Sequence, residues 1–285
     1  MNGPDGVSSE TYEFQVLDSV RSYVVLRPRG MDAGTVPTIV DFHGSGSWPE
    51  QHVAVTAASA LAAVGAIVVV PQAGIPFRLL AEWPVGWAWN VPGSPLHGET
   101  IARNEPDDLA FVDALTTRLI EQHGVDPCRI HLRGFSGGAR LASHLMATMP
   151  SRLTSVCCVG GIRFVEPAPG ELPPLLAIHG GRDALNPYQG GSGPRWAESV
   201  ETVVNQWATA SGCQPTPRRR IVSDDVCEAR YLAKGFAAVR LITVADAAHS
   251  WPGTAHVDHI AQFGASGSFN ASQAHWDFVH EVDHG

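Results

Sequence analysis

Short apolar segments that alternate with helical segments are the feature that most restricts how this chain can fold. Strand-like runs rich in β-branched residues are expected at 38–44, 66–72, 129–134, 154–161, 174–181 and 238–244. Helical segments are expected at 53–65, 104–123, 138–149, 195–212 and 272–282. Because strands that alternate with helices form βαβ units, the sequence predicts an α/β fold. Its central sheet is mostly parallel and has helices on both faces.

The first strands show a different pattern. The runs at 12–16 and 21–28 alternate apolar and polar residues close together in the chain, which predicts an antiparallel hairpin at the N-terminus. A chain of 285 residues can bury one sizeable core, and we find no internal repeat or low-complexity linker that divides it. We therefore expect a single domain over 1–285, with residues 1–10 disordered and a long Gly-, Pro- and Trp-rich loop at 73–103.

Charge and hydropathy exclude two classes of partner. The formal net charge of −9 argues against a nucleic-acid partner, and the basic run Arg218–Arg220 is interpreted as a solvated loop. The longest nearly apolar run, 57–70, is shorter than a bilayer span and contains Gly65, so no membrane partner is expected. No signal peptide is visible at the start of the chain. This predicts a cytoplasmic location by default, with an exported mature form as the alternative.

The pentad Gly134-Phe135-Ser136-Gly137-Gly138 matches G-x-S-x-G. The motif alone is a weak signal in a chain with 29 glycines, so its surroundings decide. The pentad lies between a predicted strand and a predicted helix, as a nucleophile elbow requires. We therefore interpret Ser136 as a nucleophile. The Gly137 amide, at the start of the helix, is a candidate oxyanion donor.

A serine hydroxyl is a poor nucleophile near neutral pH and needs a base that is held by an acid. In enzymes with this elbow the acid and then the histidine follow along the chain, each just after a strand. Asp183 and His249 stand at such positions and are the candidate acid and base. Asp246, in the same loop as His249, and His179, at the end of the earlier strand, are the alternatives.

A second oxyanion donor should come from the loop after the strand at 38–44. The Ser45 amide is the first choice and the Gly46 amide the second, whereas His43 is interpreted as structural. The chain has thirteen histidines, but those around His249, His256, His259 and His275 fit no common zinc spacing. The sequence therefore predicts neither a metal nor a cofactor.

Several longer motifs carry a family resemblance: HGSGS, VDPCRIHLRGFSGGA, IHGGRDALNPYQGG, WATASGC, AAHSWPG and SQAHWDF. From about Val36 to the last helix, the chain resembles the secreted poly(3-hydroxybutyrate) depolymerases and the feruloyl or acetylxylan esterases. This group belongs to carbohydrate esterase family one and has the α/β-hydrolase fold. The resemblance implies that Ser136 is the nucleophile, Asp183 the acid and His249 the base.

The five cysteines include two that flank the Pro- and Arg-rich segment after the helix at 195–212. In an oxidising compartment, Cys213 and Cys227 could staple this segment. Cys213 also matches a cysteine of the family, so the resemblance implies a disulfide between Cys213 and Cys227. The adjacent Cys157 and Cys158 are interpreted as buried apolar residues.

Tryptophans are the candidate substrate contacts. Trp83, Trp87 and Trp89 crowd the loop at 73–103, where they either pin the loop to the body or form a stacking wall. Trp251 lies beside the candidate base. From these we select Trp87, Trp89 and Trp251 as the substrate-binding residues, which makes 73–103 a loop near the active site.

Together the sequence predicts a serine carboxylic-ester hydrolase that works through an acyl-enzyme. Its expected partner is a small or polymeric ester, either a polyester like poly(3-hydroxybutyrate) or a feruloyl or acetyl ester of a polysaccharide. The main alternative is an amide-bond hydrolase, a peptidase or polyamide hydrolase, with the same triad. A non-catalytic polymer-binding module is the third interpretation, and the oligomeric state is left open.

Overall fold

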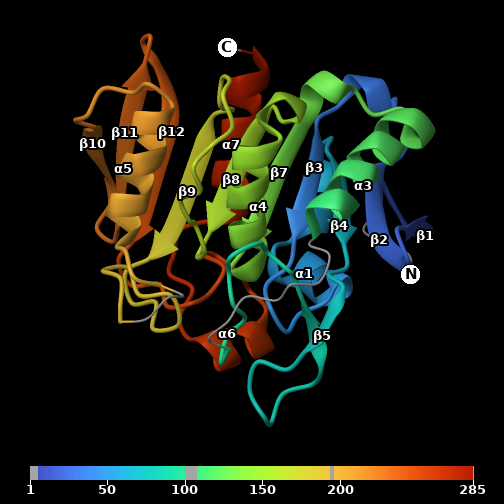
Figure 1. Ribbon diagram of the computed structural model, residues 1–285, viewed down its shortest axis with the longest axis horizontal. Helices are drawn as coiled ribbons and strands as arrows, with labels where there is room; N and C mark the ends of the chain where they lie inside the picture. Colours follow the sequence, from blue (N-terminus) through green and yellow to red (C-terminus); the bar gives the residue numbers. More distant parts are fainter. Residues whose placement is uncertain (1–5, 100–107, 193–195, 285) are drawn as a thin grey trace.

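A single large sheet organises the molecule (Figure 1). The computed structural model describes residues 6–99, 108–192 and 196–284. Within them, ten strands pair in the order β1 (Val7–Val16), β2 (Ser19–Pro28), β4 (Ile67–Pro71), β3 (Thr38–Phe42), β7 (Ile130–Phe135), β8 (Ser155–Val159), β9 (Leu175–Gly180), β12 (Phe236–Val244), β11 (Val226–Ala233) and β10 (Arg218–Ser223). Every neighbouring pair from β4 to β12 is parallel, and the pairs outside that range are antiparallel.

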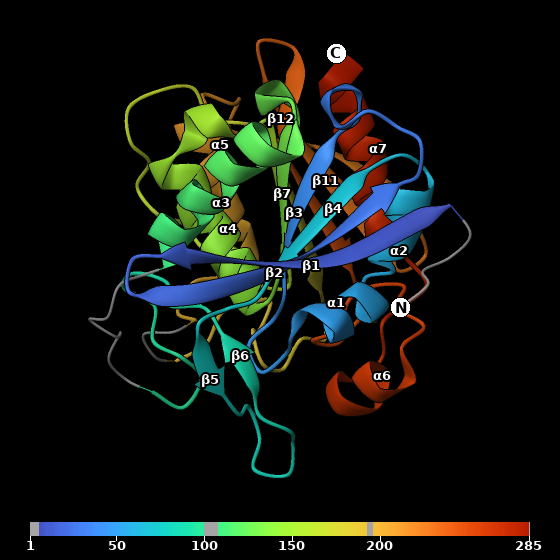
Figure 2. The same ribbon diagram turned by 90° about the vertical axis from the view of Figure 1, so that its right-hand side faces the viewer.

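Helices cover both faces of this sheet, as Figure 2 shows along its edge. One face carries α3 (Asp108–His123), α4 (Gly137–Thr148) and α5 (Val200–Ala210), and the other carries α1 (Pro49–Val55), α2 (Ala58–Ala63) and α7 (Ala271–His284). Strands β3, β4 and β8 are buried along their whole length, as expected for parallel strands covered by helices on both faces. The predicted α/β architecture and its N-terminal hairpin, β1–β2, are confirmed.

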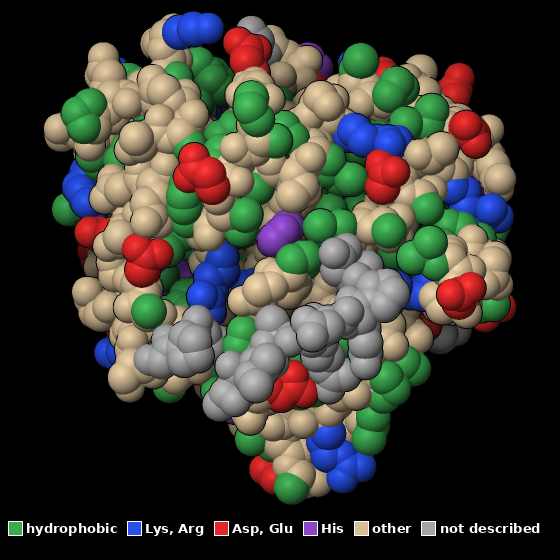
Figure 3. Space-filling view, in the orientation of Figure 1, with side chains coloured by type: hydrophobic (Ala, Val, Ile, Leu, Met, Phe, Trp, Pro, Cys, Tyr) green, Lys and Arg blue, Asp and Glu red, His purple; other side chains and the backbone are tan. Residues whose placement is uncertain are grey.

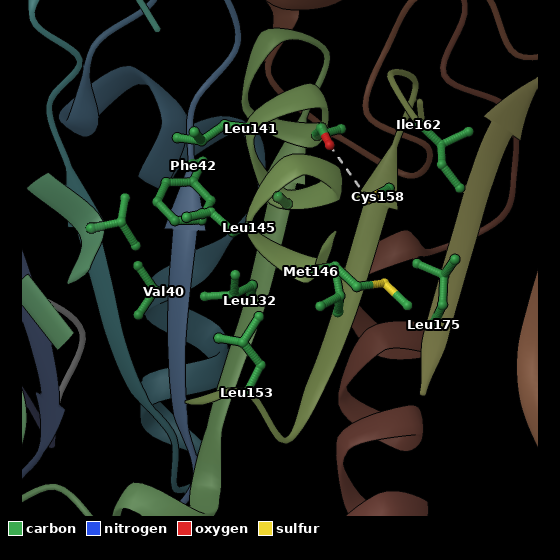
Figure 4. Close-up of a cluster of buried hydrophobic side chains, with 14 of the residues drawn as sticks. Val40, Phe42, Leu132, Leu141, Leu145, Met146, Leu153, Cys158, Ile162 and Leu175 are labelled. Atoms are coloured by element: carbon green, nitrogen blue, oxygen red, sulfur yellow. Dashed lines mark hydrogen bonds between the residues drawn. The ribbon is translucent and has the colours of Figure 1, made fainter. Parts of the chain in front are cut away.

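Helix α4 packs at the centre of the main core (Figure 4). Its apolar stripe places Leu141 and Leu145 beside Phe42 of β3, and Met146 faces the β8 side. All three helix residues are fully buried, and each contributes about 1.5–3 kcal/mol by leaving water. This packing fixes the position of α4, whose first residue, Gly137, directly follows Ser136.

The surface facing the viewer in Figure 3 carries acidic and basic side chains interspersed with apolar ones. In the part of the chain that the structure describes, no helix combines the length and the apolar character that crossing a bilayer demands.

Two expectations about the ends of the sheet are wrong. Residues 1–10 are not disordered throughout, because β1 begins at Val7, which is buried and pairs with Pro28; residues 1–5 lie outside the described part. Arg218–Arg220 is not a solvated loop but the start of the edge strand β10, which pairs with β11. Every residue of β10 is exposed, and charges on such an edge discourage pairing with other chains.

The expected disulfide is also absent, since Cys213 and Cys227 are both free thiols. The sulfur of Cys213 lies 3.7 Å from the carbonyl oxygen of Tyr231, whereas Cys227 stands four residues earlier on the same strand, β11. Four residues of strand span about 13 Å, and a disulfide needs Cα atoms within about 7 Å. Cys213 therefore lies beside the end of β11 away from Cys227, which keeps the two sulfurs apart.

The loop at 73–103 is partly ordered into a small hairpin. Its described residues, to 99, contain β5 (Ile75–Phe77) and β6 (Gly86–Ala88), which pair with each other at the end of the sheet where the parallel strands terminate. A backbone bridge between Ser47 and Trp87 ties this hairpin to the loop after β3. Residues 100–103 lie outside the described part.

The approach of α4 to β3 depends on one glycine. A Cβ atom on Gly138 would lie 2.2 Å from the carbonyl oxygen of Phe42, so no other residue fits without moving the backbone. We predict that Gly138→Ala lowers the free energy of unfolding by about 1–3 kcal/mol, the usual cost of overpacking. Denaturant unfolding measures the change. The control is Gly34→Ala, whose new methyl group meets its nearest atom at an ordinary 3.5 Å; equal losses in both variants would contradict the prediction.

Candidate active site

Ser136 occupies a strained turn between β7 and α4. Its backbone has φ 53° and ψ −109°, a conformation that residues with a side chain rarely adopt. The Ser136 amide donates to the carbonyl oxygen of Val159 on the neighbouring strand, over 2.8 Å, which holds the turn in place. The next residue, Gly137, begins α4, so the serine stands at the helix N-terminus.

The structure brings Ser136, His249 and Asp183 together at one end of the sheet. The three residues follow strands β7, β12 and β9 respectively. The Ser136 hydroxyl lies 2.9 Å from Nε2 of His249, and Nδ1 of His249 lies 2.7 Å from Oδ2 of Asp183. All three side chains are buried. The arrangement allows the imidazole to accept the serine proton while its other nitrogen donates to the carboxylate.

Asp183 is fixed by its own loop. Its Oδ1 accepts hydrogen bonds from the amides of Leu185 and Asn186, and its Oδ2 also lies 3.3 Å from Nε2 of His179. Burial alone would raise the pKa of Asp183, but the charges and hydrogen bonds of His249 and His179 outweigh it and hold the pKa well below its usual range. The acid therefore remains a carboxylate.

The alternative residues lie elsewhere or have other roles. Asp246 is exposed and pairs with Arg182 at 2.7 Å. His179 donates to the carbonyl oxygen of Asn186, so it supports the Asp183 loop and does not contact Ser136. His43 is buried; it donates to the Gly44 carbonyl and accepts from the Ala73 amide, and burial lowers its pKa to about 3.

Two unpaired amides flank the nucleophile. In the described part of the chain, neither Ser45 nor Gly137 donates its amide to a protein group. The two residues face each other, because a Cβ atom on Gly137 would lie 3.2 Å from the Ser45 nitrogen. Gly46, the second choice from the sequence, donates its amide to the Trp87 carbonyl and is not free. The arrangement suits Ser45 and Gly137 as an oxyanion hole.

An ion pair lies buried directly beneath this site. Asp41 and Arg133 are register partners on β3 and β7, fully buried and hydrogen-bonded to each other. Burial would raise the pKa of Asp41, but Arg133 and His52 reverse that effect and keep it well below its usual range. His52 donates to Asp41 over 2.9 Å. The pair therefore joins the strand that leads to Ser45 with the strand that leads to Ser136.

A pocket opens beside Ser136 and His249. Its apolar walls come from the β5–β6 segment, through Leu79 and Trp83, and from α6 (Val257–Phe263), through Phe263. The rings of Trp83 and Phe263 meet edge to face with centroids 5.1 Å apart. Phe263 also lies 5.7 Å from the His249 ring. An aromatic wall, formed by Trp83 and Phe263, thus adjoins His249.

The tryptophans selected from the sequence do not line this pocket. Trp89 and Trp251 are buried, and their indole nitrogens donate to the His43 carbonyl and to Ser272 respectively. Trp87 is half-buried and packs against the main core. The indole rings of Trp89 and Trp251 anchor loops to the body of the protein. The aromatic side chains that line the pocket are instead those of Trp83 and Phe263. Trp83 belonged to the same tryptophan-rich segment, whereas no local signal marked Phe263.

In the residues that the structure describes, no three His, Cys, Asp or Glu side chains are grouped as a metal site. The histidines near the site make other contacts. The Trp251 amide donates to Nε2 of His259, and the His259 amide donates to Nδ1 of His256. They hold the loop that carries His249.

Comparison with known proteins relates the chain to esterases. No family model matches it. It is 27% identical over 186 residues to feruloyl esterase B of Piromyces equi, covering 60% of the chain and 32% of that protein. It is 27% identical over 117 residues to feruloyl esterase C of Emericella nidulans, covering 40% of each. The chain thus spans well under half the length of either relative.

A solved structure confirms the fold. The acetyl xylan esterase from Aspergillus awamori superposes with a TM-score of 0.63 at 14% identity, over 89% of this chain and 98% of that one. The fold is therefore that of the α/β-hydrolases, and the resemblance to the feruloyl and acetylxylan esterase group is confirmed.

His259 generates a prediction about acid stability. Burial, aided by the charge of His249, lowers the pKa of His259 to about 3. Between about pH 6.5 and that value the unfolded chain takes up a proton that the folded protein does not, so stability is lost as the pH falls. We expect the free energy of unfolding of His259→Gln to fall less steeply than that of the wild type from pH 6 to pH 4, by about 1.4 kcal/mol per pH unit.

Denaturant unfolding at several pH values measures these slopes. His284→Gln, at an exposed position in α7, is the matched control and should keep the wild-type slope. Parallel curves for the wild type and His259→Gln would show that His259 is protonated in the fold.

Proposed function

We propose that this protein is a serine carboxylic-ester hydrolase. The observation that carries the proposal is the unbroken contact chain from Ser136 through His249 to Asp183, with two unpaired amides beside the serine. The sequence relatives named as feruloyl esterases support the same class of reaction.

In the first half of the reaction, His249 Nε2 takes the proton of Ser136 as Oγ bonds to the ester carbonyl carbon. The π electrons of the carbonyl move to its oxygen, which the Ser45 and Gly137 amides stabilise. When the tetrahedral intermediate collapses, the bond to the alkoxy oxygen breaks and His249 returns the proton to the leaving alcohol. The acyl group remains on Ser136. Asp183 keeps the imidazole oriented and offsets its positive charge throughout.

In the second half, water replaces the alcohol. His249 removes a proton from the water as its oxygen bonds to the acyl carbon, and the same two amides stabilise the second oxyanion. Collapse breaks the bond to Ser136, which recovers its proton from His249. The carboxylic acid leaves and the enzyme is regenerated without a cofactor.

The aromatic wall suggests the acyl group. Trp83 and Phe263, whose rings contact each other, line the pocket with His249, and Leu79 extends the apolar surface. A planar aromatic acyl group would bury much of its area against such a wall and gain ring–ring contact. We therefore propose feruloyl-like, hydroxycinnamoyl esters as the preferred substrates, ahead of acetyl esters and aliphatic polyesters.

The triad is tested by substitution. We expect Ser136→Ala to lower kcat by about 10⁶-fold and Asp183→Asn by about 10⁴-fold, because the first removes the nucleophile and the second loses the orientation of His249. Initial rates on methyl ferulate measure both. The exposed Asp246→Asn serves as the matched control and should retain wild-type kcat. More than a tenth of wild-type kcat in Ser136→Ala would rule out the assignment.

The bond type is tested with matched substrates. Methyl ferulate should turn over faster than the corresponding feruloyl amide, since the alkoxide is the better leaving group. Faster cleavage of the amide would favour the amide hydrolase. Binding of a feruloylated polymer with no turnover, in a folded protein, would favour a binding module.

The aromatic wall is tested separately. We expect Trp83→Leu to lower kcat/KM for methyl ferulate by roughly tenfold while changing that for a methyl ester of a short aliphatic acid much less, because only the aromatic acyl group loses ring contact. Trp87→Leu, in the same segment but outside the pocket, controls for disturbance of the hairpin. An equal drop on both substrates in Trp83→Leu would remove Trp83 from acyl recognition.

A further inference from the structure

The Ser45 hydroxyl is a buried polar atom with no hydrogen-bond partner in the described part of the chain. Ser45 is 9% exposed and lines the pocket together with Ser136 and His249. Leaving a buried hydroxyl unpaired costs about 1–3 kcal/mol, so such atoms are uncommon and call for an explanation. An atom of this kind at a substrate pocket is explained when the substrate supplies the partner.

The residue after the nucleophile leaves room for this hydroxyl. A Cβ atom on Gly137 would lie only 2.4 Å from the Ser45 oxygen. The hydroxyl therefore occupies the space that a side chain at position 137 would fill. Gly44, just before it, brings the same loop close to the nucleophile, since a Cβ there would lie 3.5 Å from Cβ of Ser136. The oxygen thus lies between the oxyanion loop and the first turn of α4.

We propose that the Ser45 hydroxyl is a third oxyanion donor, acting beside the amides of Ser45 and Gly137. This inference rests on the proposed ester hydrolase function. Rotation about the Cα–Cβ bond of serine moves its oxygen among staggered positions, so the hydroxyl can turn toward the substrate oxygen. It donates a hydrogen bond and keeps its proton; the only proton transferred in this step is that of Ser136, which passes to His249.

The contribution should be specific to the transition state. A hydrogen bond to a charged acceptor is stronger than one to a neutral carbonyl, and the substrate oxygen becomes charged only as Ser136 attacks. An interaction that strengthens in the transition state raises kcat and leaves ground-state binding nearly unchanged. A residue that merely packed the loop would instead act on stability or on KM.

The first test is Ser45→Ala, which removes the hydroxyl and keeps the amide. We expect kcat on methyl ferulate to fall by roughly 10²-fold with KM within about twofold. A trifluoromethyl ketone analogue, which forms a tetrahedral adduct with the serine, should bind more weakly by a similar factor. Active sites are counted by titration with an organophosphonate, so that rates refer to folded enzyme. Wild-type kcat in Ser45→Ala would overturn the proposal.

Two further variants keep the test decisive. Ser211→Ala removes another buried, unpaired hydroxyl, located after α5 and away from the pocket, and should leave kcat unchanged. Gly137→Ala should displace the Ser45 hydroxyl and lower kcat, and combining it with Ser45→Ala should cause little further loss. Recovery of activity in the double variant would mean that the hydroxyl only fills space, which refutes the proposal.

Failure of the proposed function gives a different result. A folded wild-type protein that hydrolyses none of the esters and is not labelled by the phosphonate would remove the ester hydrolase itself. A labelled, active wild type with an equally active Ser45→Ala removes only the third donor.

Discussion

The close approach of helix α4 to strand β3 is the constraint on which the rest of the site depends. It places the carbonyl oxygen of Phe42 where the side chain of any residue but glycine at 138 would lie. Because β3 ends at Phe42 and α4 begins at Gly137, this contact brings the loop after β3 against the first turn of the helix. Ser45 and Gly137 lie close together as a result. The geometry beside Ser136 therefore follows from packing between two elements far apart in the chain.

Burial acts on the ionisable groups of the site in opposite directions. Asp183 stays charged because two histidines and two backbone amides compensate for its desolvation. For His43 and His259, desolvation outweighs every opposing interaction and favours the neutral forms. Near Ser136, Asp183 therefore stays a carboxylate while the buried His43 and His259 stay neutral.

The parts of the structure that depend on local pattern could be predicted from the sequence. The parallel strands are short, mostly apolar segments that alternate with helical ones, and Ser136, Asp183 and His249 each follow one of these strands along the chain. Side-chain direction depends on tertiary packing and could not be predicted in this way. Trp89 and Trp251 turn inward, and Phe263 reaches the pocket from a helix with no motif. Likewise, the separation of Cys213 from Cys227 depends on where the segment after α5 packs against β11, which the residues around each cysteine do not specify.

The ion pair between Asp41 and Arg133 carries a consequence for how this sequence can diverge. Both residues are fully buried, so losing either leaves an uncompensated charge in the core. Replacing both with apolar residues would leave His52 and Thr56, which hydrogen-bond to Asp41, without that partner. The four positions are therefore expected to change together or not at all as the sequence diverges.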